Sequence, residues 1–256
     1  MKKIIFIPLM AFLLLFFSSC EDQINYTANN LKIHSEEIIN VRTNNSTKYY
    51  YSYNDEDRLQ MVKRYTSKLY SFEYEGEKLS EIIHHTGSYP DFPEYFCSYD
   101  NDGRLTSLTE NTDTLIAFFH HNADALPDSL YDYRDQQGWS VSYDGAGNII
   151  DESPVESDRA WSFYSEVTYD NMRNPYQIFP LAYRFLIRRQ AGSNNILSQQ
   201  YLAERPKTGY ERQVSYEYND RDYPLKRTEM RKAHKYRADS IYRTLEDTVI
   251  VHYTYY

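Results

Sequence analysis

The chain has 256 residues, of which 28 are tyrosine and 8 are glycine, and its net charge is −9. The low glycine content excludes collagen-like and glycine-rich chains, and the many aromatic residues argue against intrinsic disorder. Tyrosine favours strands, so a helical coiled coil is also excluded. The length suits one large domain or two small ones.

The first twenty residues have the order of parts that a secretory signal requires. Lys2 and Lys3 are followed by an apolar stretch at residues 4–17. A membrane-spanning helix needs about 20 apolar residues, so this stretch is too short to be one. We therefore expect it to direct export and then to be removed.

The residues that end this stretch resemble the lipobox of bacterial lipoproteins, because the small residues Ser18 and Ser19 directly precede Cys20. The resemblance implies cleavage before Cys20 and attachment of diacylglycerol to its sulfur. The alternative is an ordinary signal peptide followed by an incidental cysteine. The predicted organisation is a signal peptide at 1–19, a lipidated tether at 20–32 and one repeat-built β domain at 33–256.

The acids Glu21 and Asp22 directly follow the predicted lipid site and resemble the surface-export signal of Bacteroidota lipoproteins. They favour the cell surface, with the periplasmic face of the outer membrane as the alternative. Removing Lys2 and Lys3 with the signal takes the net charge from −9 to −11. Such a chain repels phosphate backbones, so no nucleic-acid partner is expected.

A short unit recurs through most of the remaining chain. Its copies begin at residues 51, 72, 97, 119, 141, 167 and 216, and typical copies are Tyr51-Ser-Tyr-Asn-Asp-Glu-Asp-Arg-Leu59 and Cys97-Ser-Tyr-Asp-Asn-Asp-Gly-Arg-Leu105. The copy at 119 has His121 in the tyrosine position. An apolar–polar–apolar triplet predicts a half-buried strand. The Asn, Asp and Gly that follow predict a turn, so each unit predicts a β-hairpin.

The spacing of apolar residues after each turn predicts a local irregularity. Leu59 and Val62 are separated by three positions, as are Leu105 and Leu108. Strict alternation cannot place both members of such a pair on one face, so we predict a bulge or bend after the leucine. About eight hairpins would give roughly sixteen strands, and so large a sheet must curl, close or split. Residues 249–256 predict a closing strand.

One stretch departs from the hairpin pattern and predicts a single short helix that plugs an end of the sheet. Pro180 could be its first residue, and Gly192 suits its end. Its apolar face has helical spacing and its C-terminal part is basic. These residues are Leu181, Ala182, Phe185 and Leu186 on the face, with Arg188 and Arg189 after them. An irregular loop is the alternative.

The repeated unit resembles the YD repeats of Rhs proteins, although His121 and the scarcity of turn glycines depart from that pattern. More specifically, residues 33–256 resemble a Bacteroidota family of lipoproteins of unknown function described as having a porin-like fold. The match is carried by the lipobox at Cys20 and the repeats. It is also carried by residues 169–175 before the helix, Asn194-Asn195-Ile196 after it, and the late unit at 216–225. The resemblance implies a large rolled antiparallel sheet and no particular activity.

No pattern in the sequence indicates a catalytic site, a cofactor or a metal. His84-His85 and His120-His121 could each offer one histidine to a metal, but zinc needs three or four converging ligands, so strand histidines are favoured. Residues 100–103 resemble the start of a calcium loop without its final glutamate, which favours a turn. Cys97 is expected to be a small core residue. The basic stretch at 226–237 could contact anionic lipid heads or glycans, although a solvated face is the more common role; its cations are Lys226, Arg227, Arg231, Lys232, Lys235 and Arg237.

The function favoured by the sequence is a non-enzymatic, lipid-anchored envelope protein with a binding or structural role. Its expected partners are outer-membrane lipid, through the acylated Cys20, and a possible glycan or protein ligand. The alternative is a polysaccharide-directed hydrolase, which would need two carboxylates facing each other about 5–9.5 Å apart. A membrane-spanning barrel is disfavoured by the mean hydropathy of −0.74, and a Rhs-like shell would need more repeats to enclose a cargo.

Overall fold

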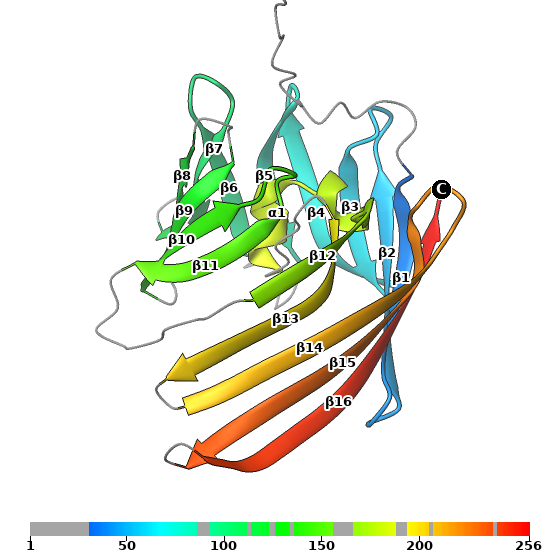
Figure 1. The fold of residues 1–256 in the computed structure, drawn as a ribbon. Coiled ribbons are helices and arrows are strands. Elements are labelled where there is room, and N and C mark those ends of the chain that lie inside the picture. Colours follow the sequence, from blue (N-terminus) through cyan, green and yellow to red (C-terminus); the bar gives the residue numbers. More distant parts are fainter. Residues whose placement is uncertain are drawn as a thin grey trace, which may run out of the picture.

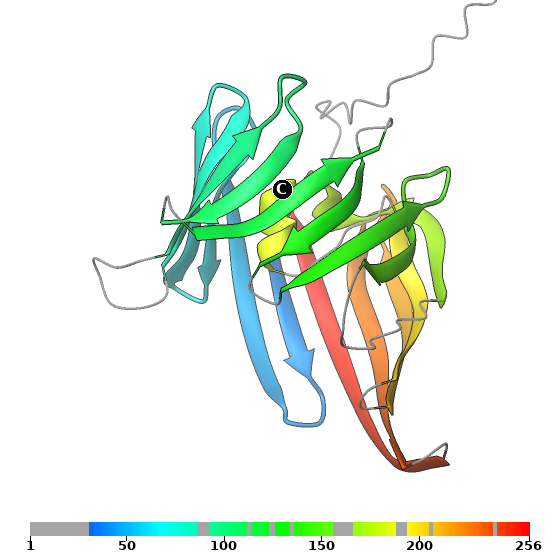
Figure 2. The same cartoon turned by 90° about the vertical axis from the view of Figure 1, so that its left-hand side faces the viewer.

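The computed structural model describes residues 31–85, 93–111, 114–122, 126–133, 136–155, 166–187, 194–204, 207–237 and 240–256. The predicted signal peptide, the predicted lipidation site Cys20 and the acids Glu21 and Asp22 lie outside these ranges. Within them, sixteen strands form one antiparallel sheet that curls into a nearly closed barrel around one short helix (Figure 1 and Figure 2). The predicted all-β fold is confirmed.

The elements follow one another along the chain almost entirely as hairpins. Their bounds are β1 (Ile33–Asn40), β2 (Asn45–Tyr53), β3 (Leu59–Arg64), β4 (Ser67–Glu75), β5 (Lys78–His84), β6 (Glu94–Tyr99), β7 (Leu105–Glu110), β8 (Thr114–His121), β9 (Pro127–Asp132), β10 (Gln137–Tyr143), β11 (Ile149–Val155), β12 (Glu166–Arg173), the 3-10 helix η1 (Pro175–Ile178), α1 (Leu181–Leu186), β13 (Asn194–Glu204), β14 (Lys207–Tyr218), β15 (Pro224–Arg237) and β16 (Ser240–Tyr255).

The two edges of the sheet are β11 and β12, and not the terminal strands. The last strand, β16, pairs with β1 from Ile33↔Tyr255 to Asn40↔Val249. This pairing confirms the predicted closing strand and joins the two halves of the chain into one sheet. The barrel therefore has its seam between β11 and β12, where the strand order has no neighbouring pair.

The predicted bulges occur directly after the leucines. Tyr53 pairs with Leu59 while Ser52 pairs with Met61, so Gln60 is the extra residue. The same shift occurs in the hairpins β4–β5, β6–β7, β8–β9, β10–β11 and β14–β15. The extra residue lets both apolar side chains of the spaced pair point inward. Leu59 and Val62 are accordingly 2% and 0% exposed.

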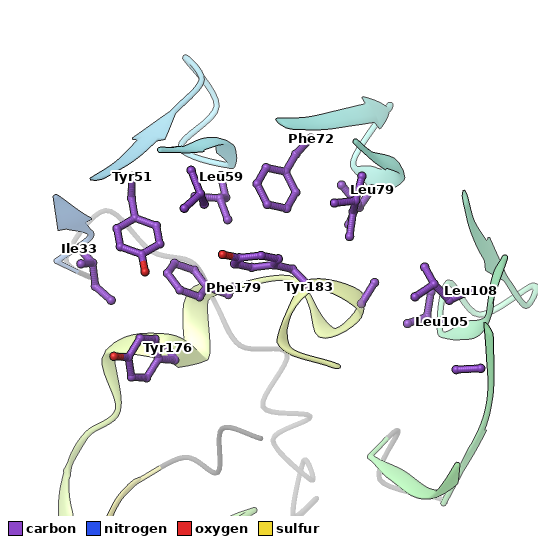
Figure 3. Packing of buried hydrophobic residues seen from close by; sticks show 14 of the residues in the cluster. Ile33, Tyr51, Leu59, Phe72, Leu79, Leu105, Leu108, Tyr176, Phe179 and Tyr183 are labelled. Atoms are coloured by element: carbon purple, nitrogen blue, oxygen red, sulfur yellow. The ribbon is translucent and has the colours of Figure 1, made fainter. Parts of the chain in front are cut away.

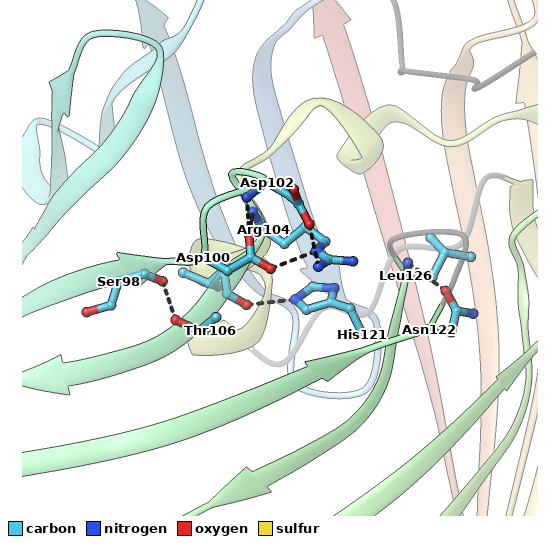
Figure 4. Close-up of polar contacts among 9 residues, drawn as sticks. Ser98, Asp100, Asp102, Arg104, Thr106, His121, Asn122 and Leu126 are labelled. Atoms are coloured by element: carbon cyan, nitrogen blue, oxygen red, sulfur yellow. Dashed lines mark hydrogen bonds and ion pairs between the residues drawn. The ribbon is translucent and has the colours of Figure 1, made fainter.

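Four of the turns are organised by the Asn or Asp that directly follows a strand tyrosine, as Figure 4 shows for Asp100. Its side-chain oxygen accepts the N–H groups of the residues two and four positions later, here Asp102 at 3.0 Å and Arg104 at 2.8 Å. Asn54, Asp144 and Asn219 make the same pair of bonds. This side-chain bracket explains why so turn-rich a chain contains so little glycine.

A second set of hydrogen bonds links the strands that lead from one hairpin to the next. In eight successive strand pairs, a tyrosine hydroxyl donates to a carbonyl at or near the start of the preceding strand over 2.6–3.1 Å, with His121 replacing tyrosine once. The pairs are Tyr53–Ile33, Tyr74–Leu59, Tyr99–Leu79, His121–Leu105, Tyr143–Pro127, Tyr169–Ile149, Tyr216–Ile196 and Tyr255–Pro224. We call these bonds rungs. Apart from the Tyr169–Ile149 rung, each rung satisfies a carbonyl that lies beyond the end of the backbone ladder between its two strands.

The rung from Tyr169 has a special place, because it crosses the seam. Its hydroxyl on β12 donates to Ile149 O on β11 over 2.6 Å. Nearby, the side chain of Asn148 accepts from Asn194 N at 2.8 Å and donates to Asn194 Oδ1 at 3.0 Å. The Tyr169 rung therefore joins the two edge strands at one end, and the Asn148–Asn194 bonds tie the β10–β11 turn to the start of β13, although the described residues show no backbone ladder between β11 and β12.

The helix is an insertion within a hairpin turn. Asp170 accepts from Met172 N two positions later, but its second bond goes to Asn195 N rather than to a residue four positions later. In the other turns, one residue separates the two N–H groups that the Asn or Asp accepts. Here the corresponding N–H groups belong to Met172 and Asn195, and the chain between them carries η1 and α1. The prediction that Pro180 begins the helix is wrong: Pro180 is the N-cap, with extended ψ of 140°. Arg188, Arg189 and Gly192 lie outside the described residues.

The inserted segment packs inside the curl of the sheet, against the N-terminal strands (Figure 3). Phe179 stacks on Tyr51 with ring centroids 5.1 Å apart, and Tyr183 meets Phe72 edge-on at 5.0 Å. Tyr183 is 2% exposed, so it contributes more to the buried face than the predicted Leu181 and Phe185, which are half-buried. The predicted short helix is confirmed, but it packs inside the curl of the sheet, against strands between β1 and β9, and not at an end of the sheet.

Candidate functional site

A cavity of about 450 Å³ lies in the other half of the barrel, on the inner face of β12–β16. Its apolar wall includes Ile38 and Val249, while Tyr176 and Asn174 of the inserted segment line it on another side. Ile149 on β11 and Val167 on β12 also line it, so the cavity extends to the seam. The size is within the range of small-molecule sites.

The charged residues of the cavity come from two paired strands. On β15, Arg227, Glu229 and Arg231 alternate with outward residues and therefore share the inner face. On β14, Arg212 pairs with Arg231, Val214 with Glu229, and Tyr216 with Arg227. Glu229 consequently lies between two arginines along its own strand, and a third approaches from the neighbouring strand. All four charged side chains line the cavity.

Glu229 is ionised and held by the three arginines. Arg231 Nε donates to Oε1 over 2.8 Å, Arg212 Nη1 lies 3.7 Å from Oε1, and Arg227 Nη2 lies 3.6 Å from Oε2. Burial by itself would raise the pKa of Glu229. The hydrogen bond from Arg231 and the charges of the arginines outweigh burial, so the pKa is below its usual range.

The cationic charge of this cluster exceeds its anionic charge. The Glu229 side chain is 2% exposed, against 23% for Arg212 and 17% for Arg227. Three guanidinium groups face one carboxylate, and only Arg231 makes a hydrogen bond to it within 3 Å. The Nε of Arg212 is buried and finds no hydrogen-bond partner in the described part of the chain. Buried charges favour further compensation by an anion.

The sequence prediction for the basic stretch at 226–237 is therefore correct for some of its residues and wrong for others. Lys226 and Lys232 face solvent and pair with Glu217 at 2.6 Å and Glu246 at 3.5 Å. Arg227 and Arg231, in contrast, point into the barrel. The period of two along the strand would have separated the inward arginines from the outward lysines. Arg227, Glu229 and Arg231 occupy every second position and therefore share one face, with an acid between two arginines.

The histidine pairs and the cysteine that the sequence analysis considered make contacts with neighbouring strands of the sheet. His84 stacks on Tyr70 at 4.5 Å, and His85 Nε2 lies 2.8 Å from Ser71 Oγ. His121 makes a rung, and His120 pairs with Asp128. Burial raises the pKa of the Cys97 thiol to about 12, as expected for a core residue. Across the described ranges, no group of three or more His, Cys, Asp or Glu residues is arranged to hold a metal ion.

The cavity does not supply the geometry of the alternative hydrolase. Among the described residues that line it, Glu229 is the one carboxylate. A glycosidase needs a second acid, and one of the two must stay protonated to donate a proton. The arginines instead keep Glu229 ionised. In the ranges that the structure covers, no helix has the length and apolar character to cross a membrane.

No family model and no curated protein matches this sequence. A crystal structure of a porin-like protein from Bacteroides uniformis is 12% identical, with a TM-score of 0.46, and the alignment covers 88% of this chain and 98% of that one. A porin-like protein from Bacteroides vulgatus is 10% identical, with a TM-score of 0.45 and coverage of 88% and 99%. The complex TcdB2-TccC3-Cdc42 is 12% identical, with a TM-score of 0.31 and coverage of 80% and 9%. Similarities at this level carry no information about what this chain binds.

Proposed function

We propose that this chain is a lipid-anchored, non-enzymatic protein of the bacterial cell envelope that binds an acidic ligand inside its barrel. The observation that carries the proposal is the cavity with Arg212, Arg227 and Arg231 around the single carboxylate of Glu229. A second carboxylate, or a sulfate or phosphate group, would compensate the remaining positive charge.

The ligand's acidic group would lie beside Arg212, because Arg231 already donates its Nε proton to Glu229 and the buried Nε of Arg212 has no hydrogen-bond partner among the described residues. Guanidinium groups match planar carboxylates and phosphates through paired donors. Tyr216 and Asn195 also line the cavity, and the Tyr216 oxygen, whose proton goes to Ile196 O, can still accept a hydrogen bond from a ligand hydroxyl. An acidic sugar has both features, namely one anion and several hydroxyls.

Calorimetric titration with glucuronate, galacturonate, sulfate and phosphate tests the proposal, with glucose as the neutral reference. We expect at least one anion to bind and glucose to bind more weakly. The substitution Arg212→Gln should weaken that binding at least about tenfold, because a hydrogen bond to a charged group contributes about 1.5–3 kcal/mol. Arg221→Gln is the matched control, since Arg221 is exposed in the β14–β15 turn.

Two results would count against the cavity as an anion site. Glucose and the anions could bind equally, or Arg212→Gln could leave anion binding unchanged while circular dichroism shows an intact sheet. Affinity should also fall as salt rises, because added salt screens the attraction between partly exposed charges.

The envelope location is supported by the lipobox resemblance at Cys20 and is tested separately. Cells fed a labelled fatty acid should label the wild-type protein and not the Cys20→Ala variant. Protease added to intact cells would then distinguish the cell surface from the periplasmic face. Labelling of Cys20→Ala, or its absence from both proteins, would contradict the anchor without affecting the cavity proposal.

A further inference from the structure

A second concave site lies on the outer face of the barrel, across β1, β2 and the β3–β4 turn. It has a volume of about 560 Å³ and is lined by His34, Tyr50, Tyr65 and Tyr256, together with polar residues. His34 lies between two of these rings, because its centroid is 4.5 Å from that of Tyr256 and 6.2 Å from that of Tyr50. Tyr65 and Tyr256 are 50% and 61% exposed. We call this site the outer groove.

The backbone of Tyr65 is unusual for so large a residue. Arg64 pairs with Ser67, so Tyr65 and Thr66 form a two-residue hairpin loop, and the φ of Tyr65 is 54°, in the left-handed region. Asn, Asp and Gly normally occupy such positions because they tolerate positive φ. The equivalent position of the β4–β5 hairpin is Gly76, with φ of 62°. Among the described residues with positive φ, Tyr65 is the one aromatic side chain.

The strained loop presents the Tyr65 ring to the outer groove. Tyr65 N donates to Lys48 O over 2.8 Å, and its hydroxyl donates to Ser46 O. Both bonds hold the tyrosine against β2, so its ring lines the groove beside Tyr50. A bulky residue in this conformation is costly for folding, and such outliers cluster at binding sites. Folding alone would favour asparagine or glycine here.

The chemistry of the outer groove suits a sugar. Its aromatic rings offer flat apolar faces for the C–H face of a pyranose ring, while their edges and hydroxyls remain polar. Ser52, Lys63 and Thr66 add hydrogen-bonding groups, and the described lining contains no carboxylate. A site with mainly aromatic walls and a few polar groups is typical of small-molecule recognition.

We propose that the outer groove is a saccharide-binding site, in which Tyr65 and Tyr256 stack on pyranose rings and Lys63, Ser52 and Thr66 bind ring hydroxyls. The site is on the opposite face of the sheet from the arginine-lined cavity. Its ligand is recognised by ring stacking rather than by charge, so its failure would leave the anion-binding proposal standing.

The test uses the full-length protein in a detergent without a sugar headgroup. A glycan array with neutral and acidic oligosaccharides identifies a bound glycan, and calorimetry then measures its affinity for each variant. We expect Tyr65→Asn to weaken binding at least about tenfold, because aromatic anchors carry much of the energy of a binding site. Tyr242→Asn is the matched control, since Tyr242 is 61% exposed and lies outside the groove.

Thermal unfolding distinguishes a binding role of Tyr65 from a structural one. Asparagine tolerates positive φ, so Tyr65→Asn should unfold at the same temperature as the wild type or a higher one. Tyr256→Ser supplies a second variant that should lose binding. The proposal is overturned if no glycan on the array binds, if Tyr65→Asn binds as tightly as Tyr242→Asn, or if Tyr65→Asn is clearly less stable than the wild type.

Discussion

The rung across the seam makes a sharp prediction about how the barrel opens. Replacing Tyr169 with phenylalanine keeps the ring and removes the 2.6 Å bond to Ile149 O. The net loss for one such bond is about 0.5–1.5 kcal/mol. The matched variant Tyr99→Phe loses the 2.8 Å bond to Leu79 O, so both should lower the free energy of unfolding by similar amounts.

The two variants should differ in local opening. Around Tyr99, β5 and β6 are also joined by backbone pairing, including Glu81↔Phe96. Around Tyr169, in contrast, the described residues of β11 and β12 show no backbone pairing, and the Tyr169 rung joins them. Loss of this rung should therefore accelerate amide exchange in β11 and β12 by about twofold to tenfold, because about 0.5–1.5 kcal/mol is lost and 1.4 kcal/mol corresponds to a factor of ten.

Denaturant unfolding measures the global loss, and hydrogen exchange followed by mass spectrometry measures the local one. Tyr242→Phe serves as the reference, because the Tyr242 side chain is exposed. Unchanged exchange in β11 and β12 of Tyr169→Phe, relative to Tyr242→Phe, would refute the role of this rung in closing the seam. Equal acceleration in Tyr99→Phe and Tyr169→Phe at their own strands would also refute it.

Two further predictions concern pH and the core. An unfolded tyrosine ionises near pH 10, whereas burial raises the pKa of Tyr70 to about 12. The unfolded state therefore loses this proton first, and the stability present below pH 10 should fall as pH rises towards 12. Phenolate absorbance followed together with circular dichroism should show ionisation and unfolding in the same pH range. Ionisation of the buried tyrosine with an intact sheet would contradict this prediction. Leu108→Ala should cost about 2–5 kcal/mol in denaturant unfolding, because Leu108 is 0% exposed. Leu225→Ala, at 44% exposure, should change stability by less than about 0.5 kcal/mol, and equal costs would contradict this account of the core.

The features predicted from the sequence are those that local spacing determines. The triplet around Tyr53 and the leucine at 59 specify a strand, a turn and a bulge within a few residues, and the structure has all three. The substitution of His121 for tyrosine also keeps its role, because the imidazole makes the rung to Leu105 O in place of a hydroxyl (Figure 4). These signals repeat, so each copy strengthens the interpretation of the others.

The features that the sequence did not predict depend on contacts between distant segments. The bond from Asp170 to Asn195 shows that the helix replaces a turn residue, but the two residues are 25 positions apart. The closing strand was predicted, but its pairing with β1 leaves the seam at β11 and β12 in the middle of the chain, and no local pattern reveals that position. The inward side of Arg227 follows from the register of β14 and β15, and a one-residue shift would have turned it to solvent.

The place of the insertion explains why one half of the barrel is filled and the other is hollow. The inserted segment leaves the sheet next to the seam, and its rings pack against apolar side chains such as Phe72 and Phe119. On β14 and β15 the inward positions include Arg212, Arg227 and Glu229, against which an apolar helix would leave charges without partners. The charged strands therefore favour a polar occupant, and this division of the interior is the physical basis for placing a ligand site there.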